Sequence, residues 1–219
     1  MNTVEDRPVR NLVFAGGMAA IVVYLLGAVT SWWFYPGPFT PLGNWLSDLG
    51  HYRRNPDGAV FYNMGCVLTA GALLVFVVGL GGWRSGALRG RALIASCQLS
   101  GLASVVSLAG LGLYSEDRMH QHMIYSNWFF ASFPLFIVLL SSGIIGHPRV
   151  SKRVGALGFA VVLLGLGFHL LFPGSRPLEW ATELGFLLFV GVLASRSQDY
   201  LDERRMHGST PEPPIELRA

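Results

Sequence analysis

The chain has 219 residues, of which 52% are hydrophobic and only 13% are charged. Soluble proteins carry about 25% charged residues, so this chain is too poor in charge to solvate a globular surface and is expected to lie in a membrane. Its formal net charge of +3 does not come from one basic patch, because the Arg residues fall in short clusters between apolar runs. Nucleic acid is therefore not an expected partner.

Six apolar runs are long enough for transmembrane helices, each of which needs about 20 residues. They predict an all-α, polytopic membrane protein with its six helices in one bundle, formed by residues 12–196. Residues 1–11 are expected to form a short arm, and residues 197–219 a tail that begins as a charged helix and ends in disorder. The expected spans lie near 12–34, 59–82, 92–113, 123–145, 154–173 and 178–196.

The basic residues indicate how the chain is oriented, because cytoplasmic loops are enriched in Lys and Arg. If the N-terminus lies inside, all but four of the 16 Lys and Arg residues fall in inner segments. Both termini are then expected in the cytoplasm. The remaining basic residues face the extracytoplasmic side: Arg53, Arg54, Arg118 and Arg176.

Small residues within the spans predict close helix packing. Ser96, Ser100 and Ser104 recur every four residues in the third span, which gives that helix a face that a neighbouring backbone can approach. Such faces also permit a homo-oligomer. Cys66 and Cys97 lie inside apolar runs and at different depths, so no disulfide is expected between them.

The stretch "SEDRMHQHMIYSN", residues 115–127, places two acids and two histidines between two long apolar runs. The predicted orientation brings further ionisable residues from other segments to the same outer level. Glu183 lies inside the sixth span, where an ionisable group is costly and commonly marks a functional site. The other residues of this level include Asp48, His51, His169 and Glu179.

One interpretation of this constellation is a zinc site, because His nitrogens and carboxylate oxygens suit zinc and a catalytic zinc takes about three such ligands. The ligands would be His120 and His169, with His122 as the alternative to His120. His120 is preferred because residues two apart point in opposite directions on a helix and Asn127 continues its face. The acids that would handle protons in such a site are Glu116, Glu183 and Asp48.

Two other interpretations stay open. In one, the histidines and acids form a structural cap that ties the loops to the helix ends. In the other, outer basic and aromatic residues hold a lipid headgroup, and the residues concerned are Arg53, Arg118, Arg176 and Trp45. A small transporter is less favoured, because the sequence has neither paired broken helices nor an inverted repeat.

Three motifs resemble the domain of unknown function 998 family, a set of archaeal and bacterial six-span proteins. They are "LSDLG", "FYNMGCVLTAG" and "SEDRMHQHMIYSNWFF", although "YSE" stands where the family pattern would have an "FPE"-like turn. The family is loosely similar to the Frag1/DRAM/Sfk1 group of eukaryotic membrane proteins. The polar positions that the resemblance implies are Ser47, Asp48, Asn63, Glu116, His120 or His122, and Glu183.

The resemblance implies the six-helix fold and a prokaryotic plasma membrane, and it gives no reaction. Its eukaryotic relatives are associated with membrane lipid handling. We therefore expect an outward-facing polar pocket that binds or processes a membrane lipid, with metal-assisted hydrolysis as the sharper version. The alternative is a non-enzymatic lipid-binding or scaffolding protein whose His and acid cluster is structural.

Overall fold

The computed structural model describes residues 6–83, 88–145 and 151–208, and this part of the chain is helical, with turns and loops and no β-strand. Six of its helices are long and apolar enough to cross a membrane, as the hydropathy predicted. Three short 3-10 helices connect them: η1 (Leu46–Gly50), η2 (Leu80–Trp83) and η3 (Glu116–Arg118). The long helices are α1 (Asp6–Trp33), α2 (Ala59–Gly79), α3 (Leu88–Leu113), α4 (Met119–Ile145), α5 (Lys152–Leu171) and α6 (Arg176–Gly208).

The bounds differ from the expected spans mainly at the two ends of the chain. α1 begins at Asp6, within the segment expected to be an arm, and α6 continues to Gly208. The tail therefore begins as a helix, as expected. The disorder predicted for its last part concerns residues 209–219, which lie outside the described residues, as do the connections at 84–87 and 146–150.

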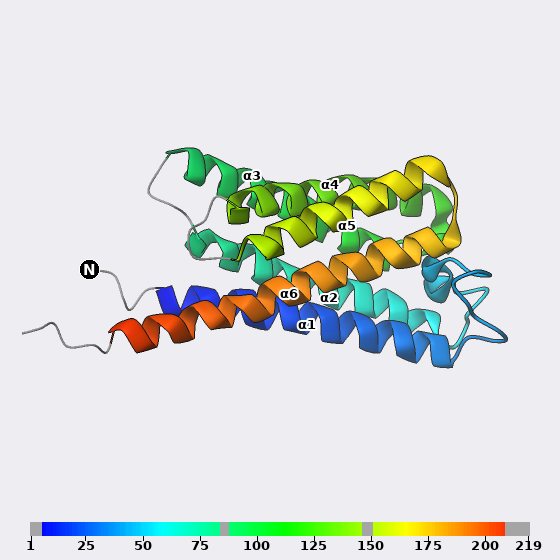
Figure 1. Cartoon of the computed structure of the whole chain (residues 1–219). Coiled ribbons are helices and arrows are strands. Elements are labelled where there is room, and N and C mark those ends of the chain that lie inside the picture. Colours follow the sequence, from blue (N-terminus) through cyan, green and yellow to red (C-terminus); the bar gives the residue numbers. More distant parts are fainter. Residues whose placement is uncertain (1–5, 84–87, 146–150, 209–219) are drawn as a thin grey trace, which may run out of the picture.

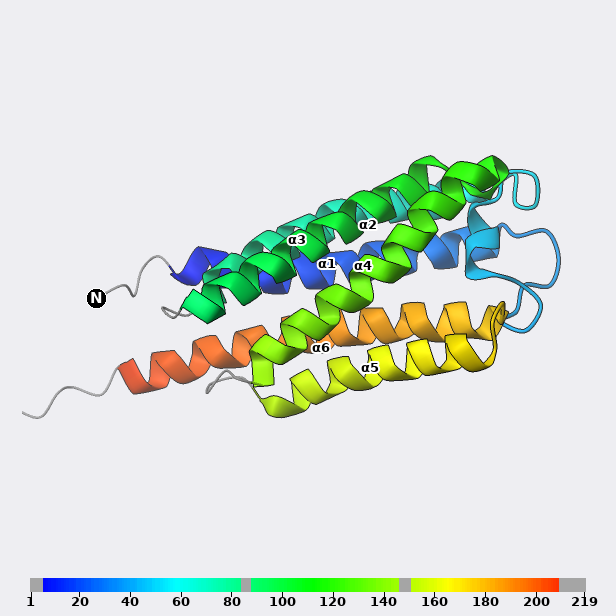
Figure 2. The ribbon, with the colours of Figure 1, turned by 90° about the horizontal axis from the view of Figure 1, so that it is seen from above.

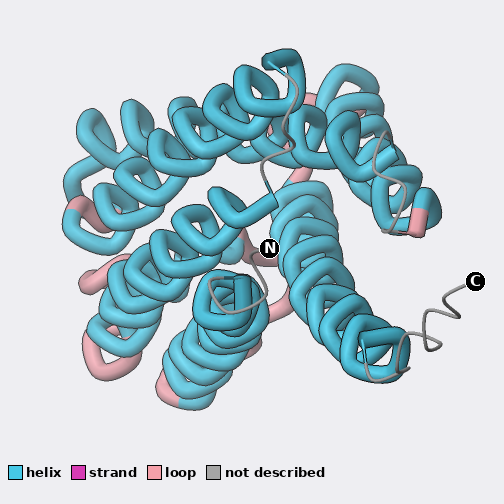
Figure 3. Tube along the Cα trace, turned by 90° about the vertical axis from the view of Figure 1, so that its left-hand side faces the viewer, coloured by secondary structure: helices cyan, strands magenta, loops and turns pink. Residues whose placement is uncertain are grey.

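The six helices form two layers, with α3, α4 and α5 in one and α2, α1 and α6 in the other (Figure 1). α4 crosses the bundle obliquely, so that it starts beside α3 and ends beside α5 (Figure 2). Figure 3 shows the bundle from the end at which α1 begins. α6 ends at that same end, while η1 lies at the opposite one, which we call the η1 end.

The contact between α1 and α2 depends on glycine. A Cβ atom at Gly27 would lie 2.9 Å from the Cα of Gly65, so any side chain there would force the two backbones apart. Where α4 faces α2 and α6, aromatic rings fill the space between the helices. Phe133 of α4 packs on Phe186 of α6 with ring centres 4.8 Å apart, and Phe136 meets Phe76 of α2 at 6.3 Å. Glycine therefore sets the separation of α1 and α2, whereas aromatic rings set the separation of α4 from α2 and α6.

Three serines form a polar contact between α3 and α4, which we call the serine layer. Ser100 Oγ donates to the backbone carbonyl of Ser132 at 2.8 Å, and Ser104 Oγ lies 2.9 Å from Ser132 Oγ. All three are buried, whereas Ser96 is exposed. The predicted small-residue face is thus confirmed at Ser100 and Ser104. Cys66 and Cys97 are both buried and free.

Buried amides hold the long connection between α1 and α2 against the bundle. The Nδ2 atom of Asn55 lies 3.1 Å from the Ser31 carbonyl and 2.9 Å from the Leu49 carbonyl, and Asn63 donates to the Gly50 carbonyl at 2.9 Å. Leu49 is fully buried. Because both sides of η1 are fixed in this way, its polar side chains have a defined position relative to the helix ends.

Candidate functional site

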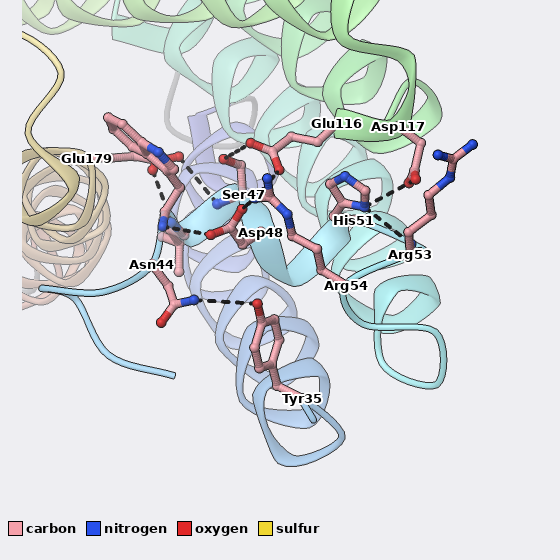
Figure 4. Close-up of polar contacts among 12 residues, drawn as sticks. Tyr35, Asn44, Ser47, Asp48, His51, Arg53, Arg54, Glu116, Asp117 and Glu179 are labelled. Atoms are coloured by element: carbon pink, nitrogen blue, oxygen red, sulfur yellow. Dashed lines mark hydrogen bonds and ion pairs between the residues drawn. The ribbon is translucent and has the colours of Figure 1, made fainter. Parts of the chain in front are cut away.

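Five residues at the η1 end are joined by hydrogen bonds and ion pairs that connect distant segments of the chain. Three come from the connection between α1 and α2, one from η3 and one from the first turn of α6 (Figure 4). Residues more than 60 positions apart in the chain therefore meet here. We call this set the η1 cluster, and its members are Ser47, Asp48, Arg54, Glu116 and Glu179.

Asp48 is the most buried acid of the cluster, with 6% of its side chain exposed. One carboxylate oxygen accepts the backbone N–H of Trp45 at 3.0 Å, and the other contacts the guanidinium of Arg54. Arg54 is about half exposed, so it lies between the buried acid and the surface. The structure turns Asp48 inward, where its charge is paired.

Glu116 shares the same guanidinium. Its Oε2 atom lies 3.5 Å from Arg54 Nη1, while its Oε1 atom accepts the hydroxyl of Ser47 at 3.3 Å. Only 10% of the side chain is exposed, and Oε2 is fully buried without a hydrogen-bond donor. One guanidinium thus faces two carboxyl groups, and Glu116 Oε2 has an ion-pair contact with it but no hydrogen bond.

Glu179 binds η1 from the other side. Its two carboxylate oxygens accept the backbone N–H groups of Leu46 at 3.0 Å and Ser47 at 3.4 Å. A carboxylate at the start of a helix satisfies N–H groups that have no partner within the helix. Glu179 lies in the first turn of α6, so these bonds fix η1 to that helix.

A second acid of η3 makes a separate connection to the same loop. Asp117 accepts the backbone N–H of Tyr52 at 2.6 Å and the hydroxyl of Ser115 at 3.2 Å, and it lies 3.1 Å from Nδ1 of His51. The backbone of Tyr52 and the His51 ring are thereby joined to η3, and His51 and Asp117 lie beside the cluster in Figure 4. This group resembles the structural cap that the sequence allowed.

Below the η1 cluster, Glu183 begins a chain of hydrogen bonds inside the bundle. The hydroxyl of Tyr24 on α1 lies 2.8 Å from the Glu183 carboxylate and 3.3 Å from the hydroxyl of Tyr62 on α2. Both tyrosines are buried, and Glu183 is half-buried. Three helices therefore contribute to one polar contact within their membrane-spanning lengths.

Carboxyl groups outnumber the basic groups paired with them at this end of the bundle. Within the described part of the chain, Arg54 is the one basic residue that forms an ion pair with any of the carboxyls of Asp48, Glu116, Glu179 and Glu183. Tyr35 beside the cluster reflects this environment. Burial, and after it the negative charge of Asp48, raise the pKa of the Tyr35 hydroxyl.

The family of the chain follows from a comparison with protein families. A family model described as "Protein of unknown function (DUF998)" matches residues 18–196. The chain belongs to the DUF998 family. The match runs from within α1 to within α6, so it includes the whole η1 cluster and confirms the resemblance found in the sequence motifs. No curated protein and no solved structure matches the chain.

In this DUF998 protein the predicted metal ligands do not converge. His120 and His169 are exposed. His122 is half-buried, and its Nδ1 lies 3.0 Å from the Tyr114 carbonyl. The expectation that His120 faces the bundle is therefore wrong, because α4 begins at Met119 with a phase that turns His122 inward. Among the residues that the structure describes, no group of three or more His, Cys, Asp or Glu side chains is placed to hold a metal ion.

The residues predicted to hold a lipid headgroup lie around the cluster rather than in one group. The guanidinium carbon of Arg176 lies 5.9 Å from the centre of the Trp45 ring, and that of Arg118 lies 5.8 Å from the Tyr114 ring. Both distances suit cation–π contacts. Arg53 is exposed, and its backbone N–H donates to His51. These arginines lie around the cluster, whereas Arg54 forms the ion pairs with its buried acids.

Tyr24 and Tyr62 were missed as site residues in the DUF998 chain. Their hydroxyls could have identified them, since each lies within an apolar span and a buried hydroxyl requires a hydrogen-bond partner. Which partner it finds depends on how α1, α2 and α6 are rotated. The special role of Arg54 was missed for the same reason, because the sequence shows it only as one of four outer basic residues.

Proposed function

We propose that this protein binds a membrane lipid whose headgroup carries a primary amine, and that the ammonium group is held by Glu116 in the η1 cluster. The observation that carries this proposal is the buried Oε2 atom of Glu116, which lacks a hydrogen-bond donor in a cluster whose acids outnumber its one guanidinium.

The charge of the cluster favours a cationic ligand. Carboxylates removed from water are costly unless a proton or a cation compensates them. Arg54 is already in contact with Asp48, so it only partly compensates Glu116. An ammonium group offers three N–H donors and one positive charge in a small volume, which suits a carboxylate oxygen that lacks a hydrogen bond. The same reasoning disfavours an anionic headgroup.

The surroundings of the cluster favour a lipid over a soluble amine. Trp180 of α6 packs on Trp32 and Phe39 with ring centres 6.0 and 5.5 Å apart, and its indole N–H donates to the Asn44 carbonyl. Aromatic rings with a polar tip are typical of the membrane–water interface. Large exposed side chains at the end of α1 and directly after α5, Trp33 and Phe172, offer apolar surface for acyl chains.

The proposal is one of binding and names no reaction. The expected zinc hydrolase needs converging ligands, and the described residues supply no such group. We also propose that the η1 end faces the extracytoplasmic side, on the distribution of Lys and Arg alone. Labelling single cysteines at positions 43 and 85 with an impermeant reagent tests this, and external reactivity at position 85 would reverse the orientation.

Native mass spectrometry of the purified protein tests the lipid. The protein is equilibrated with phosphatidylethanolamine, with phosphatidylcholine, whose quaternary nitrogen has no N–H, and with phosphatidylglycerol, which is anionic. We expect retention of phosphatidylethanolamine and at least tenfold weaker binding in Glu116→Gln, because a hydrogen bond between charged groups contributes about 1.5–3 kcal/mol.

Asp117→Asn is the matched control, since it alters a carboxyl of the same 3-10 helix that is paired with His51. It should bind as the parent does. Equal retention of all three lipids by the parent would contradict the recognition of an amine. Displacement of the lipid by free ethanolamine at comparable concentration would point to a soluble amine instead.

A further inference from the structure

The chain formed by Glu183, Tyr24 and Tyr62 is a separate feature from the η1 cluster and does not depend on the lipid proposal. Glu183 lies seven residues after the start of α6, which is about 10 Å along the helix axis. Tyr24 lies nine residues before the end of α1. The contact therefore lies within the membrane-spanning part of the bundle.

No cation compensates Glu183 among the described residues, since none of their ion pairs includes it. The Tyr24 hydroxyl is the one side chain of the described residues that bonds to it. Other ionisable groups face it from its own helix and from α2, and all of them are acids or weak acids: Glu179, Tyr62 and Cys66. The Tyr24 hydroxyl can bond to either form of the carboxyl, but the charged form has no paired cation among the described residues.

The two tyrosines can serve both states of the carboxyl. A hydroxyl both donates and accepts. When Glu183 is charged, Tyr62 donates to Tyr24, and Tyr24 donates to the carboxylate. When Glu183 carries a proton, the carboxyl donates to Tyr24, and Tyr24 donates to Tyr62. The distance between the tyrosine oxygens allows either direction. One O–H bond forms on Glu183, and the hydroxyl groups only rotate.

A route for the proton leads from the η1 end. Glu179 lies one turn closer to that end on the same face of α6, because side chains four residues apart are neighbours on a helix. Its carboxyl accepts the Ser47 N–H, and the Ser47 hydroxyl donates to Glu116. The carboxyl groups of Glu116, Glu179 and Glu183 thus follow one another from the η1 cluster into the bundle.

From this geometry we infer that Glu183, Tyr24 and Tyr62 form a proton-binding site within the membrane, which is loaded from the η1 end through Glu179. Its ligand is a single proton, and the site holds it by reversing the direction of two hydrogen bonds. Whatever the lipid site binds, this site gives the protein a group whose charge changes inside the bundle.

Infrared difference spectroscopy of the full chain in lipid vesicles tests the site. Between alkaline and acid buffer, we expect a protonated-carboxyl C=O band that is absent in Glu183→Gln. In Tyr24→Phe the band should remain and move to higher frequency, because the carboxyl has lost its hydrogen-bond partner. Tyr125→Phe is the matched control, since its ring stacks on Tyr114, and it should leave the band unchanged.

Two results would overturn the inference. One is a parent spectrum without a carboxyl band that depends on pH, and the other is the same band in Glu183→Gln. The route has its own test, in which the band is followed after rapid acidification on the side of the η1 end. Glu179→Gln should slow its appearance several-fold, whereas Asp117→Asn should not. An unchanged rate in Glu179→Gln would exclude this route.

Discussion

The serine layer and the η1 cluster are both buried and polar, and they satisfy their polar groups in opposite ways. In the serine layer, hydroxyls bond to each other and to backbone carbonyls of the two helices that carry them. In the η1 cluster, charged side chains from separate segments depend on one another. The first arrangement is neutral and complete. The second has three carboxyl groups to one guanidinium and a buried carboxyl oxygen without a hydrogen bond.

The largest effect is expected at Arg54. Arg54→Met leaves the carboxyls of Asp48 and Glu116 next to each other without a cation, which should lower the free energy of unfolding by about 2–3 kcal/mol. The half-exposed position of Arg54 keeps this below the cost of a fully buried pair. Thermal unfolding followed by tryptophan fluorescence measures the change.

The neighbouring Arg53→Met is the control, because that side chain is exposed and forms no ion pair with a described acid. A second substitution, Glu116→Gln in the Arg54→Met background, should recover part of the loss, since it removes one of the two facing charges. If Arg53→Met and Arg54→Met lower the melting temperature equally, the shared guanidinium does not hold the cluster together.

An intermediate effect is expected at Glu179. Glu179→Ala removes the acceptor for two backbone N–H groups of η1, comparable to the loss of a helix cap at about 1–2 kcal/mol. Hydrogen exchange of the peptide around Leu46 and Ser47 should become roughly tenfold faster. Asp57→Ala, an exposed acid of the same loop, should leave that exchange unchanged. Unaltered exchange in Glu179→Ala would mean that η1 does not depend on α6.

The smallest effect is expected in the serine layer. Ser104→Ala removes a hydroxyl between α3 and α4, and such contacts in membranes contribute about 0.6 kcal/mol on average. The melting temperature should fall slightly, and lipid retention should be unaffected. Ser96→Ala, at an exposed position of the same helix, should change neither. A loss at Ser104 as large as that at Arg54 would remove the contrast between the two regions.

The helices were predictable from the sequence because a span must be apolar over about 20 residues. The expected starts of α2, α3 and α4 are within four residues of the observed ones. The candidate site was predictable only in outline. Hydropathy and charge brought Asp48, Glu116 and Glu183 to one end of the bundle, but the phase of each helix decided their partners. His120 and His122 show this. The sequence indicates that they point to opposite sides of their helix, but not which of them faces the bundle.

The sequence by itself determined that this protein is a six-helix membrane protein of the DUF998 family with polar residues gathered at one level. These properties depend on the composition of the chain and on the sequence of residues within short stretches of it. The tertiary structure alone decided that Arg54 is shared by Asp48 and Glu116, that Glu179 holds η1, and that Glu183 meets Tyr24 and Tyr62. The physical reason is that each of these contacts joins separate segments whose relative rotation is set by glycine and aromatic packing along the whole bundle.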